Sequence, residues 1–449
     1  MLYPDECFDS FVCDPPYELG FMGKHWDKTG IAYNVAMWRL AFKKLKPGGY
    51  LLAFSSPRTY HRMACAIEDA GFEIRDQIAW IYGTGFAKSM SLDKAIDKQD
   101  AVQQQRARQL QFTEWMRSTG LTAAQINLLT GTNMGSHYTT AASQPTVATR
   151  EHFEKLRPWF SFAVPAWVEA MVDERSVESE NFKCREVVGV QKNASSGWSM
   201  GGDTKFVDRN ITTAATEAAK EWSGWGTTLK PAHEPICVAW KPFKGTIAQN
   251  VLKHGTGALN IEGCAIINPG EDDRFPANLI HAGDDEVLEL FPQSNGSGGS
   301  VPRVKITGYG DGIGTGKSEY LGGERIAHNA GRGSAARFFY CAKVSPNERN
   351  RGLAGLHLCE PCRYVGASPY CPTCFAAIPV AINRHPTVKP IELIRYLQRL
   401  VTRPHGLTCD LFAGSNSGGI AAKLEGFGYV GFETDPLHVL IGNAREKYA

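Results

Sequence analysis

The sequence Asp14-Pro15-Pro16-Tyr17 forms a rigid corner close to the N-terminus of the chain. Proline has a fixed φ angle and no N–H group, so the corner keeps its direction and leaves its carbonyl groups free to accept hydrogen bonds. The Asp14 carboxylate and a neighbouring carbonyl can together accept both hydrogens of one exocyclic amino group. This frees the nitrogen lone pair for attack, and the Tyr17 ring offers a face on which an extruded base can stack. The corner therefore predicts a site that activates an amino group of a nucleobase.

A second pattern with chemical meaning lies near the other end of the chain. Asp410 ends a predicted strand, Gly414 and Ser415 form a tight turn, and a predicted helix follows directly. Glycine lets a ligand approach the backbone, and the free N–H groups at a helix start attract a carboxylate. Glu433 follows about 20 residues after the turn, where an acid binds the ribose hydroxyls of a nucleoside. The pattern indicates a nucleoside-containing cofactor, although strand–glycine–helix units that bind nothing share it.

Four of the twelve cysteines form two Cys-x-x-Cys pairs that are separated by eight residues: Cys359 with Cys362, and Cys371 with Cys374. Two such pairs with prolines in their turns are typical of a tetrahedral four-thiolate zinc site. Because four protein ligands leave no open coordination position, we expect a structural zinc ion. The other cysteines are scattered singly, which is typical of a reducing compartment.

One glycine-rich stretch resembles a phosphate-binding loop but departs from its pattern. Residues 311–318 have Asp311 where the first glycine is required, and no helical periodicity follows. A phosphate loop needs a helix N-terminus directly after it. We therefore predict a surface loop at 295–335 and no nucleotide triphosphate site.

Strands and helices alternate at both ends of the chain. Apolar runs and glycine turns predict strands at 8–14, 50–56, 73–83, 406–414 and 429–435. Helical periodicity predicts helices at 33–46, 60–72, 390–401 and 417–426. This alternation implies an α/β fold with a parallel sheet and right-handed crossovers. We expect the two ends of the chain to form one sheet that is split by a long insertion.

The chain resembles the beta class of DNA amino-methyltransferases, including phage and prophage members. The resemblance rests on "DPPY" at 14–17, "HPTVKP" at 385–390, and "DLFAGS" followed by "FETD" near the C-terminus, in the order that this class shows. It covers residues 1–98 and 217–449. It implies a Rossmann-like, S-adenosylmethionine-dependent methyltransferase fold with circularly permuted motif order, a large inserted recognition region and a small four-cysteine zinc ribbon.

The resemblance also implies roles for individual residues. The target base is assigned to Asp14, Pro15, Pro16 and Tyr17. The cofactor S-adenosylmethionine is assigned to Asp410, Phe412, Gly414, Ser415, Glu433, Thr387 and Lys389, the last two near its methionine end. Asn416 replaces a glycine of the family's turn, and we expect the turn to be kept because asparagine tolerates left-handed backbone.

The resemblance implies methyl transfer to the exocyclic N6 of adenine in double-stranded DNA. Two alternatives remain open: transfer to N4 of cytosine, and a catalytically silent homologue that binds DNA. Methyltransferases that act on RNA or on protein glutamine have a similar corner. They usually begin it with asparagine and place it after the glycine turn, so the order of motifs here argues against them.

Four segments follow from these patterns. We expect the catalytic half of the methyltransferase domain at 1–98, an insertion with target recognition at 99–335, a basic segment with the zinc ribbon at 336–382, and the cofactor half at 383–449. Within the insertion, residues 108–160 contain a helix–glycine turn–helix pattern that resembles a DNA-reading helix-turn-helix. Helical hairpins that read no DNA share this pattern.

The formal net charge of +2 neither demands nor excludes a polyanionic partner. Residues 337–405, however, carry ten Lys and Arg against three Asp and Glu, which either DNA phosphates or a solvated basic face explains. No apolar stretch approaches the roughly 20 residues that span a bilayer. The first ten residues lack the features of a signal peptide. We therefore expect a cytoplasmic protein of a bacterial host with no membrane partner, and a homodimer is left open.

Overall fold

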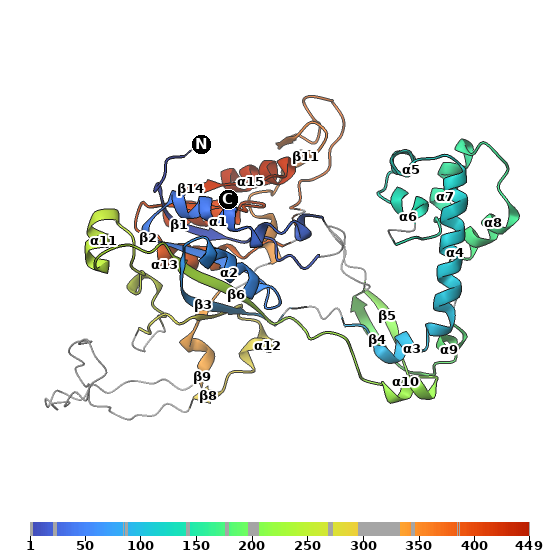
Figure 1. Ribbon diagram of the computed structural model, residues 1–449, viewed down its shortest axis with the longest axis horizontal. Helices are drawn as coiled ribbons and strands as arrows, with labels where there is room; N and C mark the ends of the chain where they lie inside the picture. Colours follow the sequence, from blue (N-terminus) through green and yellow to red (C-terminus); the bar gives the residue numbers. More distant parts are fainter. Residues whose placement is uncertain are drawn as a thin grey trace. The chain divides into compact units, whose positions relative to one another are not determined.

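The computed structural model describes residues 3–20, 25–83, 85, 89–140, 144–175, 179–195, 206–267, 273–294, 333–342, 346–383, 385 and 387–448. These residues fall into two compact units, and both chain ends belong to the first of them (Figure 1). The first unit is Met1–Gly85 with Pro231–Ala449, and the second is Phe86–Lys230. The phosphate-loop look-alike at 311–318 lies outside the described residues.

The first unit is built on an eight-stranded sheet in the order β10-β7-β3-β6-β2-β1-β13-β14. The strands are β1 (Phe8–Cys13), β2 (Leu45–Phe54), β3 (Glu73–Ile81), β6 (His233–Trp240), β7 (Leu279–His281), β10 (Tyr340–Cys341), β13 (Leu407–Asp410) and β14 (Gly428–Gly431). β1 pairs in parallel with β13, with Ser10 opposite Thr408. The two ends of the chain therefore form one sheet, as expected from the sequence.

One strand of this sheet runs against its neighbours. β6 lies between β2 and β3 and is antiparallel to both, whereas the other pairs in the sheet are parallel. The α/β class with a mostly parallel sheet is confirmed, but the direction of β6 was not foreseen. A strand that is buried on both faces reads as a continuous apolar run in either direction, so its sequence does not reveal which way it runs.

Helices cover both faces of the sheet. On one face, α13 (Ile391–Val401) and α14 (Ser417–Glu425) share a core with alternate strand residues such as Leu52. On the other face, α1 (Val35–Lys44) and α2 (Tyr60–Asp69) pack on the residues between them, such as Leu51. The unit also contains α11 (Ile247–His254), α12 (Asp285–Leu288), α15 (Pro436–Tyr448), and the two-stranded sheets β8 (Gln293–Ser294) with β9 (Gly333–Ser334) and β11 (His357–Cys359) with β12 (Tyr364–Gly366). Among the described residues, no helix combines the length and apolar character needed to cross a bilayer.

The second unit is mainly helical and has its own core. Its helices are α3 (Leu92–Ile96), α4 (Gln99–Ser118), α5 (Ala123–Thr130), α6 (Gly135–Thr139), α7 (Arg150–Leu156), α8 (Ala166–Asp173), α9 (Glu180–Lys183) and α10 (Glu217–Glu221), with a hairpin of β4 (Val187–Ser195) and β5 (Phe206–Thr212). The predicted helix–turn–helix pattern is present as α5, Gly131 with φ 72°, and the short α6. Buried Arg185 pairs with Asp93 and Asp97, which fastens the residues before the hairpin to α3.

The units differ in extent from the segments that the sequence suggested. The insertion was expected at 99–335, whereas the second unit ends at Lys230 and β6 belongs to the sheet of the first unit. The residues of β6 from Pro235 to Trp240 are all buried, because the strand lies inside the sheet and both faces of the sheet are covered.

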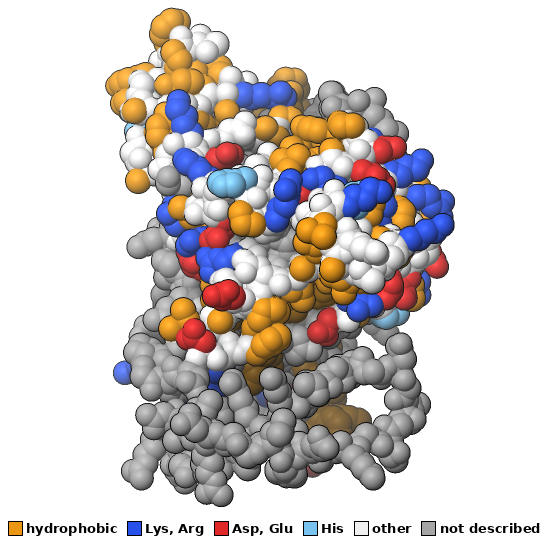
Figure 2. Space-filling model, turned by 90° about the vertical axis from the view of Figure 1, so that its left-hand side faces the viewer, with side chains coloured by type: hydrophobic (Ala, Val, Ile, Leu, Met, Phe, Trp, Pro, Cys, Tyr) orange, Lys and Arg blue, Asp and Glu red, His pale blue; other side chains and the backbone are white. Residues whose placement is uncertain are grey.

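Much of the positive charge in residues 337–405 is used inside the first unit. The pairs are Arg395 and Arg399 with Glu425, Arg403 with Asp9, and Lys389 with Asp14 and Glu234. On the face drawn in Figure 2, Lys and Arg side chains lie between Asp, Glu and hydrophobic side chains. The local excess of basic residues is thus partly balanced by acids from distant parts of the chain.

Candidate active site

The corner at 14–17 and the glycine turn at 410–416 meet at the carboxyl ends of two neighbouring strands of the sheet. β1 and β13 are parallel neighbours, with Phe11 opposite Cys409, so these ends lie side by side. Asp14 directly follows β1, and Asp410 is the last residue of β13. The two carboxylates are near enough for Asp14 to raise the pKa of Asp410. Residues almost 400 positions apart in the sequence therefore contribute to one site.

Asp14 offers a carboxylate with one oxygen in use and one free. Its Oδ2 accepts a hydrogen bond from Lys389 Nζ at 2.8 Å, and the Asp14 side chain is 19% exposed. Its Oδ1 is buried and has no hydrogen-bond partner in the described part of the chain. Burial raises the pKa of Asp14, Lys389 opposes this shift, and Glu234 adds to it. A buried acceptor without a partner is costly and suits an incoming N–H donor.

Tyr17 is held by one hydrogen bond at its hydroxyl and one at its backbone carbonyl. Its hydroxyl donates to Glu234 Oε2 at 2.6 Å, and its backbone carbonyl accepts from Thr59 Oγ1 at 2.8 Å. Burial raises the pKa of Tyr17 well above its ordinary value, with Asp14 and Glu234 adding to the shift, so the phenol stays neutral. Pro15 is buried and Pro16 half-buried beside it. These two hydrogen bonds hold Tyr17 beside the two prolines.

Glu234 and Tyr82 belong to this site, and sequence reasoning gave neither of them a role. Glu234 lies at the start of β6 and accepts from Tyr17, with Tyr82 Oη at 3.5 Å from its Oε1. Because β6 is antiparallel, its first residues lie beside the carboxyl ends of the parallel strands. The only signal in the sequence is an acid directly before an apolar run, which is too common to identify a site residue.

Lys389 lies among the acids of the corner. Its Nζ is 2.8 Å from Asp14 Oδ2 and 3.3 Å from Glu234 Oε2, and its side chain is 9% exposed. Burial alone would lower the pKa of Lys389, but Asp14 and Glu234 raise it above its ordinary value. The sequence assigned Lys389 to the methionine end of the cofactor; in the structure its Nζ contacts Asp14 and Glu234. Thr387 is exposed.

The glycine turn has left-handed backbone and passes close to neighbouring side chains. Gly414 has φ 53°, and its N–H donates to Glu433 Oε2 at 2.8 Å. A Cβ atom at Gly414 would lie 2.8 Å from Nε2 of His385, so no other residue fits here without displacement. Asn416 has φ 65° and its Oδ1 caps α14 by accepting from Gly419 N–H, which confirms that asparagine keeps the turn.

Asp410 and Phe412 form the start of the turn. The Phe412 N–H donates to Asp410 Oδ1 at 2.9 Å, and the Phe412 ring packs near Trp38 with ring centroids 6.5 Å apart. Burial raises the pKa of Asp410 to about 7; the Phe412 N–H opposes this shift, and Asp14 and Glu433 add to it. Asp14 and Glu433 thus lie near enough to Asp410 for their charges to act on it, and this concentration of negative charge favours a ligand that carries positive charge.

The raised pKa of Asp410 predicts a pH-dependent cost in stability. Its folded-state value of about 7 exceeds its ordinary value of 3.8, so the unfolded chain releases the proton first. Stability therefore falls as pH rises from about 4 to 7, and the loss is complete above pH 7. Asp410→Asn removes the buried charge and keeps an acceptor for Phe412 N–H.

We expect Asp410→Asn to stabilise the ligand-free protein by about 1–3 kcal/mol at pH 8, and by less at pH 5.5. Urea unfolding at the two pH values measures the difference. A gap between variant and wild type that does not grow with pH would contradict the buried-charge explanation.

Ser415 is fixed by two residues that the sequence did not point to. Its Oγ accepts from Asn383 Nδ2 at 2.9 Å and from Arg445 Nη1 at 3.0 Å, and Arg445 also donates to the Ser415 carbonyl. Arg445 lies on α15 and is fully buried. The far end of the chain thus holds the glycine turn in place.

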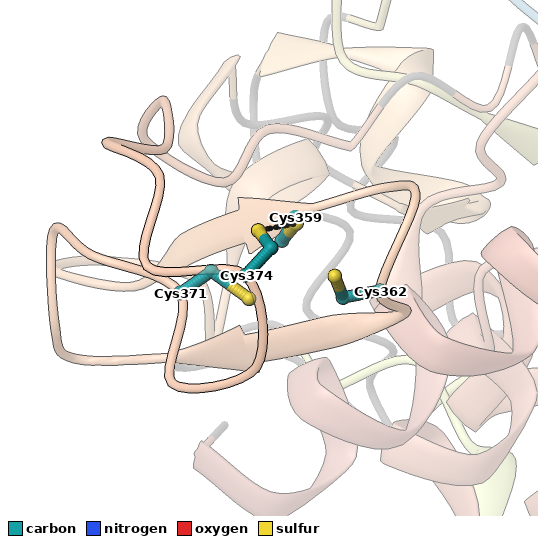
Figure 3. A group of neighbouring side chains, drawn as sticks. All are labelled: Cys359, Cys362, Cys371 and Cys374. Carbon is teal, nitrogen blue, oxygen red and sulfur yellow. Dashed lines mark hydrogen bonds between the residues drawn. The ribbon is translucent and has the colours of Figure 1, made fainter.

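The four predicted zinc ligands come together in a separate cluster. The Sγ atoms of Cys359, Cys362, Cys371 and Cys374 all lie within 4.8 Å of one another, and Figure 3 shows the side chains gathered around one centre. The Sγ atoms of Cys359 and Cys374 are 3.8 Å apart. Zn–S bonds of about 2.3 Å in a tetrahedron give S···S distances of about 3.8 Å. The cluster therefore fits a zinc ion.

The two Cys-x-x-Cys turns have matching backbones. Arg363 directly follows Cys362 with φ 52°, and Phe375 directly follows Cys374 with φ 59°. Non-glycine residues seldom adopt positive φ, so both turns hold strain at equivalent positions. β11 and β12 form the antiparallel hairpin that carries the first turn. Matched strained turns that aim four thiols at one point are typical of a metal knuckle.

The chain belongs to the DNA methylase family of N6 and N4 amino-methyltransferases. The model of this family matches residues 177–443, which is more than half of the chain. The match includes β6 with Glu234, the four cysteines, the glycine turn and Glu433.

Individual relatives are more distant. The type II methyltransferase M.PvuII of Proteus hauseri is 35% identical over 60 residues, which are 13% of this chain and 18% of that protein. The matched segment thus spans less than a fifth of that relative. Among solved structures, a PvuII DNA methyltransferase described as cytosine-N4-specific has 12% identity and a TM-score of 0.36, covering 99% of this chain and 81% of that one. M1.HpyAVI has 9% identity and a TM-score of 0.32, covering 98% and 87%.

Proposed function

We propose that this protein transfers a methyl group from S-adenosylmethionine to the exocyclic N6 of adenine in double-stranded DNA. The observation that carries this proposal is the meeting of Asp14, with its free Oδ1, and the Gly414 turn on adjacent strands. Membership of the DNA methylase family supports DNA as the substrate and methyl transfer as the reaction. The sequence Asp-Pro-Pro-Tyr favours adenine within this family.

The residues of the glycine turn fit the cofactor. Glu433 keeps its carboxylate oriented by accepting from the N–H groups of Gly414, Thr434 and Asp435, and its Oε2 retains a lone pair for a ribose hydroxyl. Phe412 supplies an apolar wall, while Asp410 and Ser415 suit the charged methionine end. When bound, S-adenosylmethionine supplies a methyl group on a sulfonium, and the electron pair of the broken C–S bond stays on sulfur.

The corner at 14–17 activates and positions the target. Asp14 Oδ1 and a neighbouring main-chain carbonyl accept the two hydrogens of the amino group, which frees the nitrogen lone pair to form the new N–C bond. The nitrogen then gives up one proton to the Asp14 carboxylate, from which it passes to solvent. Extruding the base costs a few kcal/mol, which stacking on Tyr17 offsets. Positioning and these two acceptors provide most of the rate enhancement.

The experiment is to express the chain in a host that lacks DNA methylation and to analyse the DNA nucleosides by mass spectrometry. We expect N6-methyladenine, and none with the Asp14→Ala variant as a matched control. N4-methylcytosine would instead support the cytosine alternative, which uses the same type of amine. Unmodified DNA from a chain that still binds S-adenosylmethionine would contradict the proposal and favour a silent DNA-binding homologue. Incubation with RNA and labelled S-adenosylmethionine tests whether the protein methylates RNA instead of DNA.

The second unit is our candidate for target recognition. It has a core of its own, formed by residues such as Phe112, Trp115 and Ile126, so the sheet of the first unit does not need it for burial. The α5–Gly131–α6 element exposes Asn133 and Ser136. These polar side chains suit base edges in the major groove.

We also propose one structural zinc ion at Cys359, Cys362, Cys371 and Cys374. The distances between their sulfur atoms support this assignment, and four thiolates leave no position for catalysis. The base of this ribbon shares a small core with α15, in which Leu358 and Ala381 lie with Ile441 and Ala444.

Elemental analysis of protein purified without chelator should find one zinc per chain. Cys371→Ser should lose the zinc and lower the melting temperature, because the thiolate is buried and one ligand of four is gone. Cys65→Ser, which changes an exposed cysteine outside the cluster, should keep both. Wild-type protein that contains far less than one zinc per chain would contradict the proposed zinc site.

A further inference from the structure

A second carboxylate, Glu234, shares the partners of Asp14. The Nζ of Lys389 lies 2.8 Å from Asp14 and 3.3 Å from Glu234, so one cation serves two anions. The three side chains are between 9% and 19% exposed. With all three ionised, the group carries one net negative charge.

Glu234 also fixes two aromatic hydroxyls. Its Oε2 accepts from Tyr17 at 2.6 Å, and its Oε1 lies 3.5 Å from the hydroxyl of Tyr82. Tyr17 is the ring on which the extruded base is proposed to stack, so Glu234 sets the position of that ring. Lys389 Nζ lies 5.1 Å from the centre of the same ring, so the Glu234 carboxylate and the Lys389 ammonium both contact Tyr17.

We propose that Glu234 is a positioning residue for methyl transfer: it shares Lys389 and holds Tyr17, and thereby leaves one oxygen of Asp14 free for the target amine. This inference rests on the proposed function. Without Glu234, Lys389 would pair with Asp14 alone and compete with the amine for its oxygens. The net charge of Asp14 and Lys389 together would then be zero. The negative charge that attracts the amine hydrogens would be lost.

The charged and titratable groups that face Asp14 come from every side of the corner. They are Lys389 before α13, Glu234 on β6, Tyr17 on its own loop, Asp410 at the end of β13, and the thiol of Cys13 at the end of β1. Burial raises the pKa of Asp14, Lys389 and the nearby Tyr17 hydroxyl lower it, and Glu234 raises it. Removing the charge of Glu234 therefore leaves Lys389 less opposed, and the pKa of Asp14 falls.

The test compares Glu234→Gln with wild type in methyl transfer to duplex DNA, at saturating S-adenosylmethionine, over a range of pH. The amide has nearly the same shape and still accepts from Tyr17. We expect kcat to fall about 10–100-fold, because a small misplacement of the reacting groups can lower the rate by up to about 10²-fold. The acidic limb of the kcat profile should move to lower pH, because Asp14 ionises more easily. A purely structural role would lower kcat without moving the limb.

Two further variants keep the result interpretable. Glu234→Asp retains the charge, so its acidic limb should stay at the wild-type pH even if kcat falls. Glu262→Gln neutralises an exposed acid of the same unit and should match wild type throughout. An unmoved limb in Glu234→Gln, or a limb that moves equally in Glu234→Asp, overturns the role of Glu234. A wild-type protein that binds S-adenosylmethionine but transfers no methyl group overturns the proposed function and this inference together.

Discussion

Asp14→Asn should lower the rate of methyl transfer at least about 10³-fold, within the range that loss of an essential acid–base group and an electrostatic contact produces. The amide turns one acceptor oxygen into a donor, so the target amine meets an N–H group where it needs a lone pair. The nitrogen also loses the carboxylate that takes its proton. Single-turnover transfer of a labelled methyl group to duplex DNA measures this loss.

The same variant should bind S-adenosylmethionine almost as wild type does, within about threefold, because the glycine turn and Glu433 are untouched. Titration calorimetry measures this affinity. Asp69→Asn, which changes an exposed acid on α2, is the control and should keep full activity. Retained turnover in Asp14→Asn would show that the acid of the corner does not activate the target.

Glu433→Ala should lose affinity for S-adenosylmethionine, which Asp14→Asn keeps. The Glu433 carboxylate accepts from Gly414 N–H at 2.8 Å and is proposed to bind a ribose hydroxyl of the cofactor. A charge-assisted hydrogen bond of this kind contributes about 1.5–3 kcal/mol, so affinity for S-adenosylmethionine should fall roughly 10–100-fold. DNA affinity should stay near that of wild type, because the second unit and the corner are unchanged.

Calorimetry with S-adenosylmethionine and a fluorescence anisotropy titration with duplex DNA measure the two affinities of Glu433→Ala. Glu68→Ala, at an exposed position of α2, is the matched control. Unchanged cofactor affinity in Glu433→Ala would place the cofactor elsewhere, and the glycine turn would lose its proposed role.

The sequence predicts the parts of the fold that local chemistry determines. The rigid corner, the glycine turn and the two Cys-x-x-Cys pairs each need particular residue types, so each is visible as a short pattern. The left-handed Asn416 follows from the same reasoning, since few residues accept φ 65°. Alternating strands and helices also predict that the chain ends share one sheet.

The sequence does not predict contacts that depend on the direction of a strand or on a distant helix. Glu234 reaches the site only because β6 is antiparallel, and a buried antiparallel strand looks like a parallel one. Arg445 reaches Ser415 from α15, thirty residues away, and nothing near it marks this contact. The position of Lys389 beside Asp14 likewise depends on how the segment before α13 packs.

A crystal structure of the protein with an unreactive analogue of S-adenosylmethionine tests the central claim most directly. The claim is that the corner at 14–17 and the turn at 410–416 form one site for methyl transfer. An amine nitrogen must lie about 3 Å from both the Asp14 carboxylate and the methyl carbon. We therefore predict the analogue's ribose at Glu433 and the atom that replaces the methyl group about 6 Å from the Asp14 carboxylate. An analogue bound away from the Gly414 turn, or with that atom more than about 10 Å from Asp14, would contradict the account.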